Sequence, residues 1–258
     1  MVYHILNGDA MLDRFNDTKI PGEVLSMREC LIEGDLGGDT LEEFIAHRSR
    51  FLADTYQADP GAYAIADLID KITHAPDHTE FNLWFEYDLF CQCNMWFLLS
   101  LLAPLNDTKK VFIIYSFWST PAARWRGFGP ATVMNFIDWY GRRVPCDQKD
   151  LDLAVELWNT YKVNDLIRLE ELAMAKSNCF PYLDEVCFAH IDRFGLSGED
   201  GRPEKRIQSI LKEFPTADFS KVFVEFTRWE GVYGFGDSQL KHIYDKVIGT
   251  SNQNGIGY

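Results

Sequence analysis

The sequence predicts an α/β protein with a mainly parallel sheet and flanking helices, and three observations support this fold class. Short apolar runs typical of strands alternate with longer stretches of helical periodicity through the first half of the chain. This alternation favours parallel strands, because a parallel crossover needs a connection long enough to form a helix. The run Lys110–Tyr115 contains consecutive apolar residues, as expected for a strand buried on both faces. The 258 residues, 47% of them hydrophobic, can bury a sizeable core.

Four strands are predicted in the first half, and each one leads into a turn or a helix. They span His4–Leu6, Gly22–Met27, Phe81–Phe85 and Lys110–Tyr115. Helices are predicted over Thr40–Tyr56, Tyr63–Ile72 and Leu89–Leu102, and the first of these begins at the cap-like residue Thr40.

The second half changes in texture from about Pro145 and becomes mainly helical. Helices are predicted over 147–161, 163–177, 182–194, 205–214 and 239–248, with a glycine- and charge-rich linker at 195–202 and a strand over Val222–Thr227. The chain therefore divides into an α/β domain with a candidate ligand crevice (1–144), a helical segment (145–194) and a small α+β unit (195–258). The order of elements in the last unit is typical of a winged helix. Its tail, 249–258, is rich in Gly, Ser and Asn and is expected to fray.

Charge and hydropathy exclude several classes of function. The net charge of −14 repels nucleic acid over most of the surface, and residues 190–258, with 9 Lys/Arg and 10 Asp/Glu, offer no basic stripe. No run reaches the roughly 18 apolar residues of a membrane span. The start, Met1-Val-Tyr-His-Ile-Leu6, lacks the features of a secretory signal, so we expect a cytoplasmic protein without a membrane partner. The six cysteines form no Cys-x-x-Cys pair, and we expect reduced, mainly buried thiols.

Polar residues follow all four predicted strands, and this pattern predicts the functional site. Ligands of open parallel sheets bind beyond the carboxyl ends of the strands, where the loops meet. The fourth strand leads to Arg126 through a longer loop. The residues predicted to line the crevice are Asn7, Gly8 and Asp9 after the first strand, Arg28 and Glu29 after the second, and Glu86 and Asp88 after the third.

Each of these residues also has a structural interpretation. Asp9 and Asp88 are placed where a side chain caps a following helix. Gly8 is suited to a positive φ angle, and Arg28 with Glu29 would make a weak surface pair. Glu86 follows Leu-Trp-Phe in an apolar surround, where an unpaired carboxylate is costly. It therefore needs Arg28, Arg126 or a metal ion as a partner, or it has a raised pKa.

Several well-known site patterns are missing from the sequence. The chain has no G-x-G-x-x-G or Walker A motif, no G-x-S-x-G elbow and no H-E-x-x-H pattern. Because the predicted loops supply carboxylates, a bound metal would be a hard, oxygen-liganded ion such as Mg²⁺ or Mn²⁺. Its predicted ligands are Asp9, Glu86 and Asp88.

Five strings together resemble an uncharacterised bacterial family, the proteins with domain of unknown function 1835 and its companion C-terminal domain. The most specific string is Leu83-Trp-Phe-Glu-Tyr-Asp-Leu-Phe-Cys-Gln92, and it adds Gln92 to the predicted ligand-binding residues. The resemblance implies one coherent bacterial, cytoplasmic protein and implies no established reaction. The other strings are His4-Ile-Leu-Asn-Gly-Asp9, Arg28-Glu-Cys-Leu-Ile-Glu-Gly34, Arg126-Gly-Phe-Gly129 and Gly234-Phe-Gly-Asp237.

Two functions from different classes fit these observations. In the first, the chain is a metal-dependent enzyme that acts on a phosphorylated or nucleotide-like small molecule, with Glu86 and Asp88 as catalytic residues. Arg28 and Arg126 would then meet phosphate oxygens, since guanidinium groups bind phosphate bidentately. In the second, the same crevice senses a small molecule without chemistry, and the C-terminal unit contacts a partner or DNA.

Overall fold

The sheet has five strands in the order β2-β1-β3-β4-β5 in the described part of the chain. The computed structural model describes residues 1–57, 65–195 and 199–253. The first four strands are parallel, and the short β5 pairs antiparallel with β4 at the edge. The strands are β1 (Val2–Asn7), β2 (Glu23–Met27), β3 (Glu80–Trp84), β4 (Lys110–Ile114) and β5 (Val144–Pro145).

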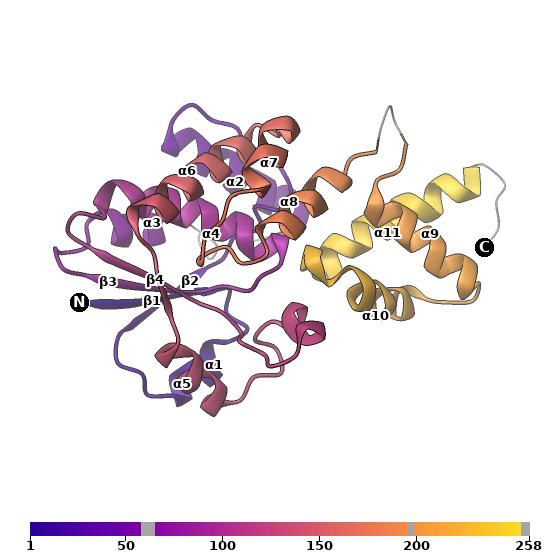
Figure 1. Cartoon of the computed structure of the whole chain (residues 1–258). Coiled ribbons are helices and arrows are strands. Elements are labelled where there is room, and N and C mark those ends of the chain that lie inside the picture. The colour runs from indigo at the N-terminus through magenta and orange to yellow at the C-terminus, as the bar shows by residue number, and fades with distance from the viewer. Residues whose placement is uncertain (58–64, 196–198, 254–258) are drawn as a thin grey trace.

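Helices cover both faces of the sheet and also form the C-terminal end of the molecule (Figure 1). The first-half helices are α1 (Leu12–Asp17), α2 (Leu41–Tyr56), α3 (Ile65–Thr73), α4 (Leu89–Leu102) and α5 (Val133–Gly141), with 3₁₀ helices η1 (Ala103–Leu105) and η2 (Pro121–Arg126). The second-half helices are α6 (Gln148–Lys162), α7 (Leu166–Ala173), α8 (Leu183–Asp192), α9 (Arg202–Glu213), α10 (Phe219–Glu230) and α11 (Asp237–Gln253), with the 3₁₀ helix η4 (Gly231–Tyr233).

The two faces of the sheet carry cores of different size. The short helices α1 and α5 cover one face, where Phe15, Trp84 and Phe136 pack together. On the other face α4 lies at the centre of a larger core, with α6 packed against it. Nearly every residue of α4 is buried, so this helix is enclosed on all sides rather than amphipathic.

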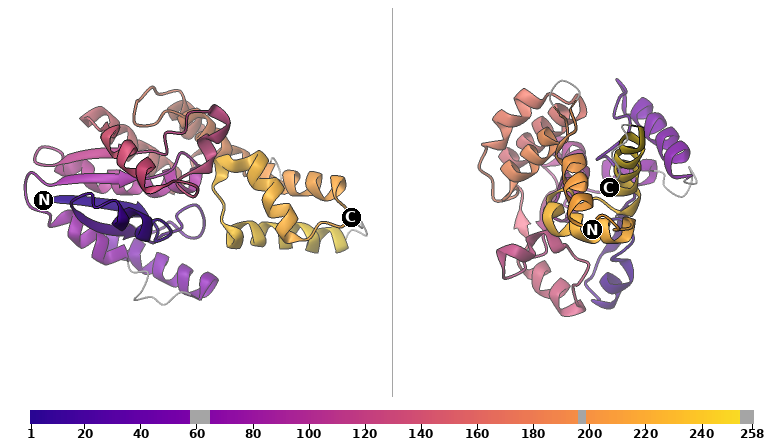
Figure 2. Two further views of the ribbon diagram at one scale, coloured as in Figure 1. Left: turned by 90° about the horizontal axis from the view of Figure 1, so that it is seen from below. Right: turned by 90° about the vertical axis from the view of Figure 1, so that its right-hand side faces the viewer.

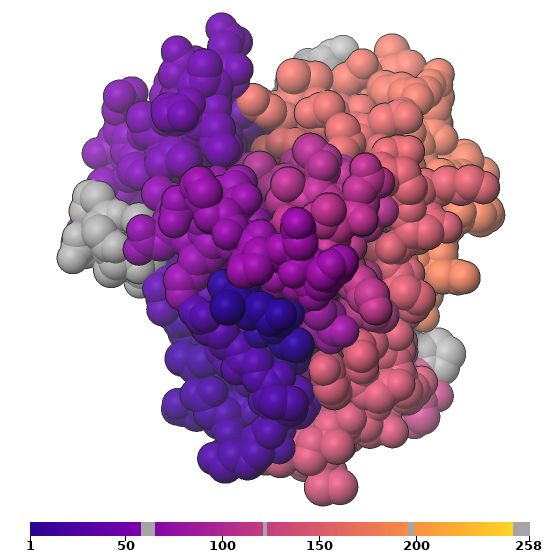
Figure 3. Space-filling model, turned by 90° about the vertical axis from the view of Figure 1, so that its left-hand side faces the viewer, coloured from indigo at the N-terminus to yellow at the C-terminus, as the bar shows by residue number. Residues whose placement is uncertain are grey.

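The sheet register brings the loops after the parallel strands to one edge. Asn7 pairs with Met27, and Leu6 pairs with Trp84, so β1, β2 and β3 end at nearly the same level. The C-terminal helices α9–α11 project from the end of the molecule beyond this edge (Figure 2). Figure 3 shows the opposite end, where the chain begins in the middle of the surface. The crevice predicted beyond the strands therefore faces the C-terminal unit.

Most of the predicted elements are confirmed. The four predicted strands and the helices over 40–56, 89–102, 147–161 and 182–194 agree with the structure within a few residues at their ends. The residues of the Tyr63–Ile72 prediction before Ile65, and of the tail after Gln253, lie outside the described ones. Thr40 is the N-cap of α2, where its side chain accepts a hydrogen bond from the Glu43 backbone N–H. Sequence reasoning missed the short α1, α5 and β5.

The strand predicted over Val222–Thr227 is wrong, because these residues lie within α10. The run combines β-branched and aromatic residues, which favour strands. However, Val222 and Phe226 are buried and stand four residues apart, a helical spacing, and Asp218 caps the helix start. The described part of the C-terminal unit is helical, and a winged helix is not confirmed. None of the helices in the described residues combines the length and apolar composition needed to cross a bilayer.

Candidate functional site

Two adjoining cavities lie at the carboxyl edge of the sheet, between the α/β part and the C-terminal helices. The first has a volume of about 390 Å³ and is lined by residues that include Gly8, Asp9 and Arg28. The second has a volume of about 320 Å³ and is lined by residues that include Glu86 and Asp88. The residues that line both cavities are Asn7, Phe90 and Gln239. These shared walls make the two cavities neighbouring halves of one cleft.

Glu86, Asp88 and Cys91 form the chemical centre of the second cavity. One ligand atom from each, a carboxylate oxygen or a sulfur, lies within 4.8 Å of the others. Asp88 is the N-cap of α4, where it accepts a hydrogen bond of 3.0 Å from the Cys91 backbone N–H. The capping interpretation of Asp88 is thus confirmed, and the cap also fixes its carboxylate beside Glu86 and Cys91.

Two glycines from distant parts of the chain pack directly onto the two carboxyl groups. A Cβ atom on Gly127 would lie 2.0 Å from Glu86 Oε1, and a Cβ atom on Gly234 would lie 2.0 Å from Asp88 Oδ1. Both glycines have φ angles in the left-handed region, +58° and +63°. The backbone N–H of Phe128 donates to Glu86 Oε1. The site therefore closes around Glu86 and Asp88 from two separate segments, 127–128 and Gly234.

Burial raises the pKa of Glu86 to about 8, and the neighbouring Asp88 charge adds to the shift. Burial also raises the pKa of Asp88, although the capping N–H opposes this shift. Neither carboxyl group belongs to an ion pair with a described residue. Among the described residues Glu86 forms no ion pair with Arg28 or Arg126, so these two predicted partners are wrong. The raised pKa is the predicted alternative that agrees with the structure.

The side chains around this pair are held by a buried hydrogen-bond network. Asn7 donates to Cys91 Sγ at 3.0 Å and accepts from Asn94 at 2.8 Å. Gln92 is buried and donates to the backbone carbonyl of Glu86 at 2.8 Å. Asn7 lines the cleft as predicted. Gln92 holds the Glu86 backbone through this hydrogen bond. It is not among the described lining residues of either cavity.

The first cavity presents a half-exposed ion pair. Arg28 Nε donates to Asp9 Oδ2 at 2.7 Å, and this hydrogen bond lowers the pKa of Asp9. The predicted capping role of Asp9 is wrong, because α1 has Met11 as its N-cap and no side-chain cap. Gly8 has the predicted positive φ, +82°, and its N–H donates to Met27 O. Open space surrounds the position of a Cβ on Gly8.

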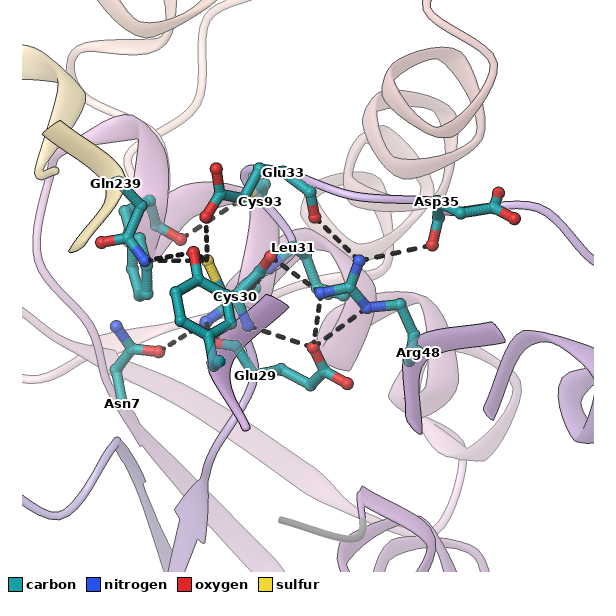
Figure 4. A network of polar contacts seen from close by, with 12 residues as sticks. Asn7, Glu29, Cys30, Leu31, Glu33, Asp35, Arg48, Cys93 and Gln239 are labelled. Atoms are coloured by element: carbon teal, nitrogen blue, oxygen red, sulfur yellow. Dashed lines mark hydrogen bonds and ion pairs between the residues drawn. The ribbon is translucent and has the colours of Figure 1, made fainter. Parts of the chain in front are cut away.

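Glu29 lines the first cavity, but its carboxylate is committed to a buried ion pair (Figure 4). Arg48, in α2, donates to Glu29 Oε2 through Nε at 3.1 Å and Nη2 at 2.9 Å. Arg48 also donates to the backbone carbonyl oxygens of Glu33 and Cys30. The predicted surface pair between Arg28 and Glu29 is therefore wrong. Arg48 instead pins the loop that follows β2.

Gln239, near the start of α11, ties the C-terminal unit to this wall of the cleft. Its side-chain amide donates to Tyr56 Oη at 2.8 Å and to Cys30 Sγ at 3.4 Å (Figure 4). Its side-chain oxygen accepts from the Gly236 N–H. On the opposite wall, Arg14 donates to the carbonyl oxygens of Gly129 and Ala131. Residues as far apart in the sequence as Asn7 and Gln239 thus line one site.

The structure separates some residues that the sequence grouped. Asp9 lies outside the cluster of Glu86, Asp88 and Cys91, so the predicted three-carboxylate metal set is not brought together among the described residues. Arg126 is exposed at the end of η2 and is not among the described lining residues of either cavity. Sequence reasoning missed Cys91, Arg14 and Gln239. Cys91 had a signal, since it stands three residues after Asp88 on the same helix turn.

Comparisons with known proteins identified no related protein. A scan against protein-family models, a search of curated proteins and a search of solved structures each found no match to this chain.

Proposed function

We propose that this chain is an enzyme that binds a divalent cation between Glu86 and Asp88 and acts on a phosphorylated or nucleotide-like small molecule. One observation supports this most strongly: the two carboxyl groups lie buried together, without a basic partner among the described residues. Two ionised carboxylates in a low-dielectric site repel each other. A cation between them removes this repulsion, and it also stabilises the negative charge that develops on transferring phosphoryl oxygens.

The donor atoms favour Mg²⁺ or Mn²⁺ as long as Cys91 remains a thiol. Burial raises the pKa of Cys91 well above its usual value, with contributions from the charges of Asp88 and Glu86. A protonated thiol leaves two carboxylates as ligands, which suit hard cations. If Zn²⁺ displaced the thiol proton, Cys91 would become a third, soft ligand. The response to different metals therefore tests the role of Cys91.

The first cavity supplies the proposed place for the rest of the substrate. Arg28 and Gly8 line it together with an apolar wall of Met27, Leu52 and Tyr56. This cavity also contains the half-exposed carboxylate of Asp9, which is paired with Arg28 and repels a free phosphate. A phosphorylated ligand would be held against this charge by the cation, which bridges phosphate and carboxylate oxygens. We therefore expect phosphorylated ligands to bind only when the cation is present.

The cation is tested by titrating Mn²⁺ into the purified chain and following the free-ion signal by electron paramagnetic resonance. The wild-type chain should bind a single ion, and Glu86→Gln and Asp88→Asn should each weaken binding by roughly tenfold or more. Asn is a good N-cap, so Asp88→Asn preserves the start of α4. Asp9→Asn is the matched control and should bind as tightly as wild type. Cys91→Ser should weaken Zn²⁺ but not Mn²⁺. A wild-type chain that binds no Mn²⁺ would refute the proposal.

The anion is tested by thermal-shift measurements with nucleoside phosphates and sugar phosphates, with and without Mn²⁺, followed by assays of released phosphate. Arg28→Ala should lower the affinity for a stabilising compound, whereas Arg126→Ala, at an exposed position outside the cavities, should not. Stabilisation that is independent of Mn²⁺ would separate the anion site from the cation site and contradict the bridging arrangement.

A second candidate is a non-catalytic sensor of a small molecule, and one observation favours it. The C-terminal unit contributes Gly234, Gly236 and Gln239 to the cleft, so a bound molecule would touch both parts of the chain. A ligand in that place can change how the C-terminal unit meets a partner. Ligand-induced stabilisation without any turnover would support the sensor over the enzyme.

We also propose that the chain is related to the proteins with domain of unknown function 1835. The support is that the strings containing Asn7, Glu86, Gly127 and Gly234 all contribute to the same site.

A further inference from the structure

Two cysteines outside the cleft lie close enough to react with each other. Cys146 directly follows β5, and Cys179 lies in the connection between α7 and α8. Their sulfur atoms are 3.4 Å apart, and both side chains are buried free thiols. The two residues are 33 positions apart in the sequence, so the contact depends on the tertiary fold.

Strand β4 and the residue that follows it hydrogen-bond to the backbones of both cysteines. The N–H of Cys146 donates to the carbonyl of Val111, in β4, at 2.9 Å. Tyr115, just after β4, donates its hydroxyl to the carbonyl of Cys179 at 2.5 Å. Because both anchors belong to one buried segment, the two sulfur atoms are held facing each other.

Cys146 is the member of the pair with access to solvent. It lines a surface cavity of about 460 Å³ together with Asp150, Lys176 and Ser177. Cys179 is enclosed, and its thiol lies 3.5 Å from the carbonyl oxygen of Pro145. The contact with Cys146 and burial both raise the pKa of Cys179, so this residue remains a protonated thiol at neutral pH. A small oxidant therefore reaches Cys146 first.

We propose that Cys146 and Cys179 form a reversible disulfide when the protein meets a hydroperoxide. The sulfur of Cys146 attacks the terminal peroxide oxygen, the O–O bond breaks, and the products are a sulfenic acid and one molecule of water or alcohol. The sulfur of Cys179 then attacks the Cys146 sulfur, so an S–S bond forms and the S–O bond breaks. The departing hydroxide takes the Cys179 proton and leaves as water. Two thiols are oxidised and one peroxide is reduced.

The surroundings of Cys179 suit the second step. Asp150 accepts a hydrogen bond of 2.6 Å from Ser177, whose hydroxyl in turn accepts from the Cys179 backbone N–H. The Asp150 carboxylate also raises the pKa of Cys179, so the thiol keeps its proton until the departing hydroxide takes it. Disulfide sulfurs are about 2.05 Å apart, so the atoms must approach by about 1.4 Å from their present contact. A shift of this size is within reach of a loop residue such as Cys179.

The pair also connects to the candidate functional site through buried side chains. Tyr115, which holds the Cys179 carbonyl, stacks on Tyr87 with ring centroids 4.3 Å apart. Gln92 lies 3.5 Å from the Tyr115 hydroxyl and donates to the Glu86 carbonyl. These contacts form a continuous series of buried groups between Cys179 and the backbone of Glu86.

The proposal is tested on the unmodified full chain, treated with a small excess of hydrogen peroxide and then denatured in N-ethylmaleimide. Four of the six cysteines should become alkylated, and peptide mapping should recover a cross-linked peptide containing Cys146 and Cys179. Dithiothreitol should restore six alkylated cysteines. The oxidised protein should melt roughly 5–10 °C higher, because the bond closes a long loop. Cys187→Ser is the control, since Cys187 is buried elsewhere and its loss should leave the cross-link intact.

The variant Cys146→Ser should abolish the cross-link, and a melting curve will show whether it is folded. Six alkylated cysteines after peroxide treatment of the wild-type chain would overturn the proposal. So would a cross-link between a different pair, or a Cys146 that oxidises to sulfinic acid without bonding to Cys179. These outcomes are independent of the proposed cation site, because no metal or substrate enters the experiment.

Discussion

Glu29 and Glu86 occupy equivalent places in the fold and have different partners. Each follows a parallel strand, β2 or β3, and each lines a cavity at the carboxyl edge of the sheet. The carboxylate of Glu29 meets the guanidinium of Arg48, which is fully buried (Figure 4). The carboxyl group of Glu86 meets Asp88, Cys91 and a backbone N–H. The carboxylate of Glu29 is balanced by a positive charge, and the carboxyl group of Glu86 has no such partner among the described residues.

The comparison shows that a position at the carboxyl edge of the sheet is not enough to make a carboxylate functional. A buried charge paired with a buried opposite charge is fixed in one protonation state and contributes to the shape of the loop. A buried carboxyl group without such a partner has a raised pKa and retains affinity for a cation or a proton. The partner, which lies elsewhere in the sequence, decides between the two roles.

The largest expected effect is the loss of stability in Glu29→Gln. This change leaves the buried guanidinium of Arg48 without its counter-charge, which should lower the free energy of unfolding by about 3–5 kcal/mol. Urea denaturation followed by circular dichroism gives this value. The double variant Glu29→Gln/Arg48→Met should recover part of the loss, because it removes both charges. A Glu29→Gln chain as stable as wild type would show that Arg48 finds another counter-charge, and the contrast with Glu86 would fail.

The glycines that pack on the carboxyl groups should give the next largest effect. An added Cβ on Gly234 would overlap Asp88 Oδ1 at 2.0 Å and would impose a side chain on a φ of +63°. We expect Gly234→Ala to lose about 2–4 kcal/mol of stability and to disturb cation binding. Gly8→Ala is the matched control, since its φ is also positive but its Cβ meets open space, and it should lose only about 1 kcal/mol. Equal losses in the two variants would mean that backbone strain alone sets the cost at Gly234.

These contrasts show what the sequence could reveal and what it could not. The alternation of apolar runs and helices predicted the parallel sheet, and the polar residues after the strands predicted the edge where Asn7, Arg28 and Glu86 now lie. Local pattern could not show that Arg48 turns inward to Glu29, because the helical periodicity of α2 only places it on a face. It also could not show that Gly127 and Gly234 cover Glu86 and Asp88, since these contacts join segments far apart in the chain. The strand predicted at 222–227 failed for a related reason: its residues fit both periods, and packing decided for the helix.

The smallest effect is expected at Glu86, and its sign is opposite to that at Glu29. The pKa of Glu86 rises from 4.5 to about 8 on folding, mainly through burial. A raised pKa in the folded state stabilises the protein below pH 4.5, and this contribution is lost as the pH rises toward 8. Glu86→Gln mimics the protonated carboxyl group, because its amide oxygen can still accept from Phe128 N–H. Without divalent cations, the variant should match wild type at pH 5.

At pH 8 the Glu86→Gln variant should be more stable than wild type by about 1–3 kcal/mol. Folding of the wild type at this pH requires either a buried negative charge beside Asp88 or the uptake of a proton that the unfolded chain has lost to the solvent. Denaturation curves in a chelator at pH 5, 6, 7 and 8 measure the difference. Glu213→Gln, on the exposed surface of α9, is the matched control and should follow the wild-type profile. Adding Mn²⁺ at pH 8 should reverse the order, since the ion stabilises the wild-type chain that binds it. If Glu86→Gln is destabilised at pH 8 in the chelator, then Glu86 is balanced by a cationic group as Glu29 is, and the two loops have the same role.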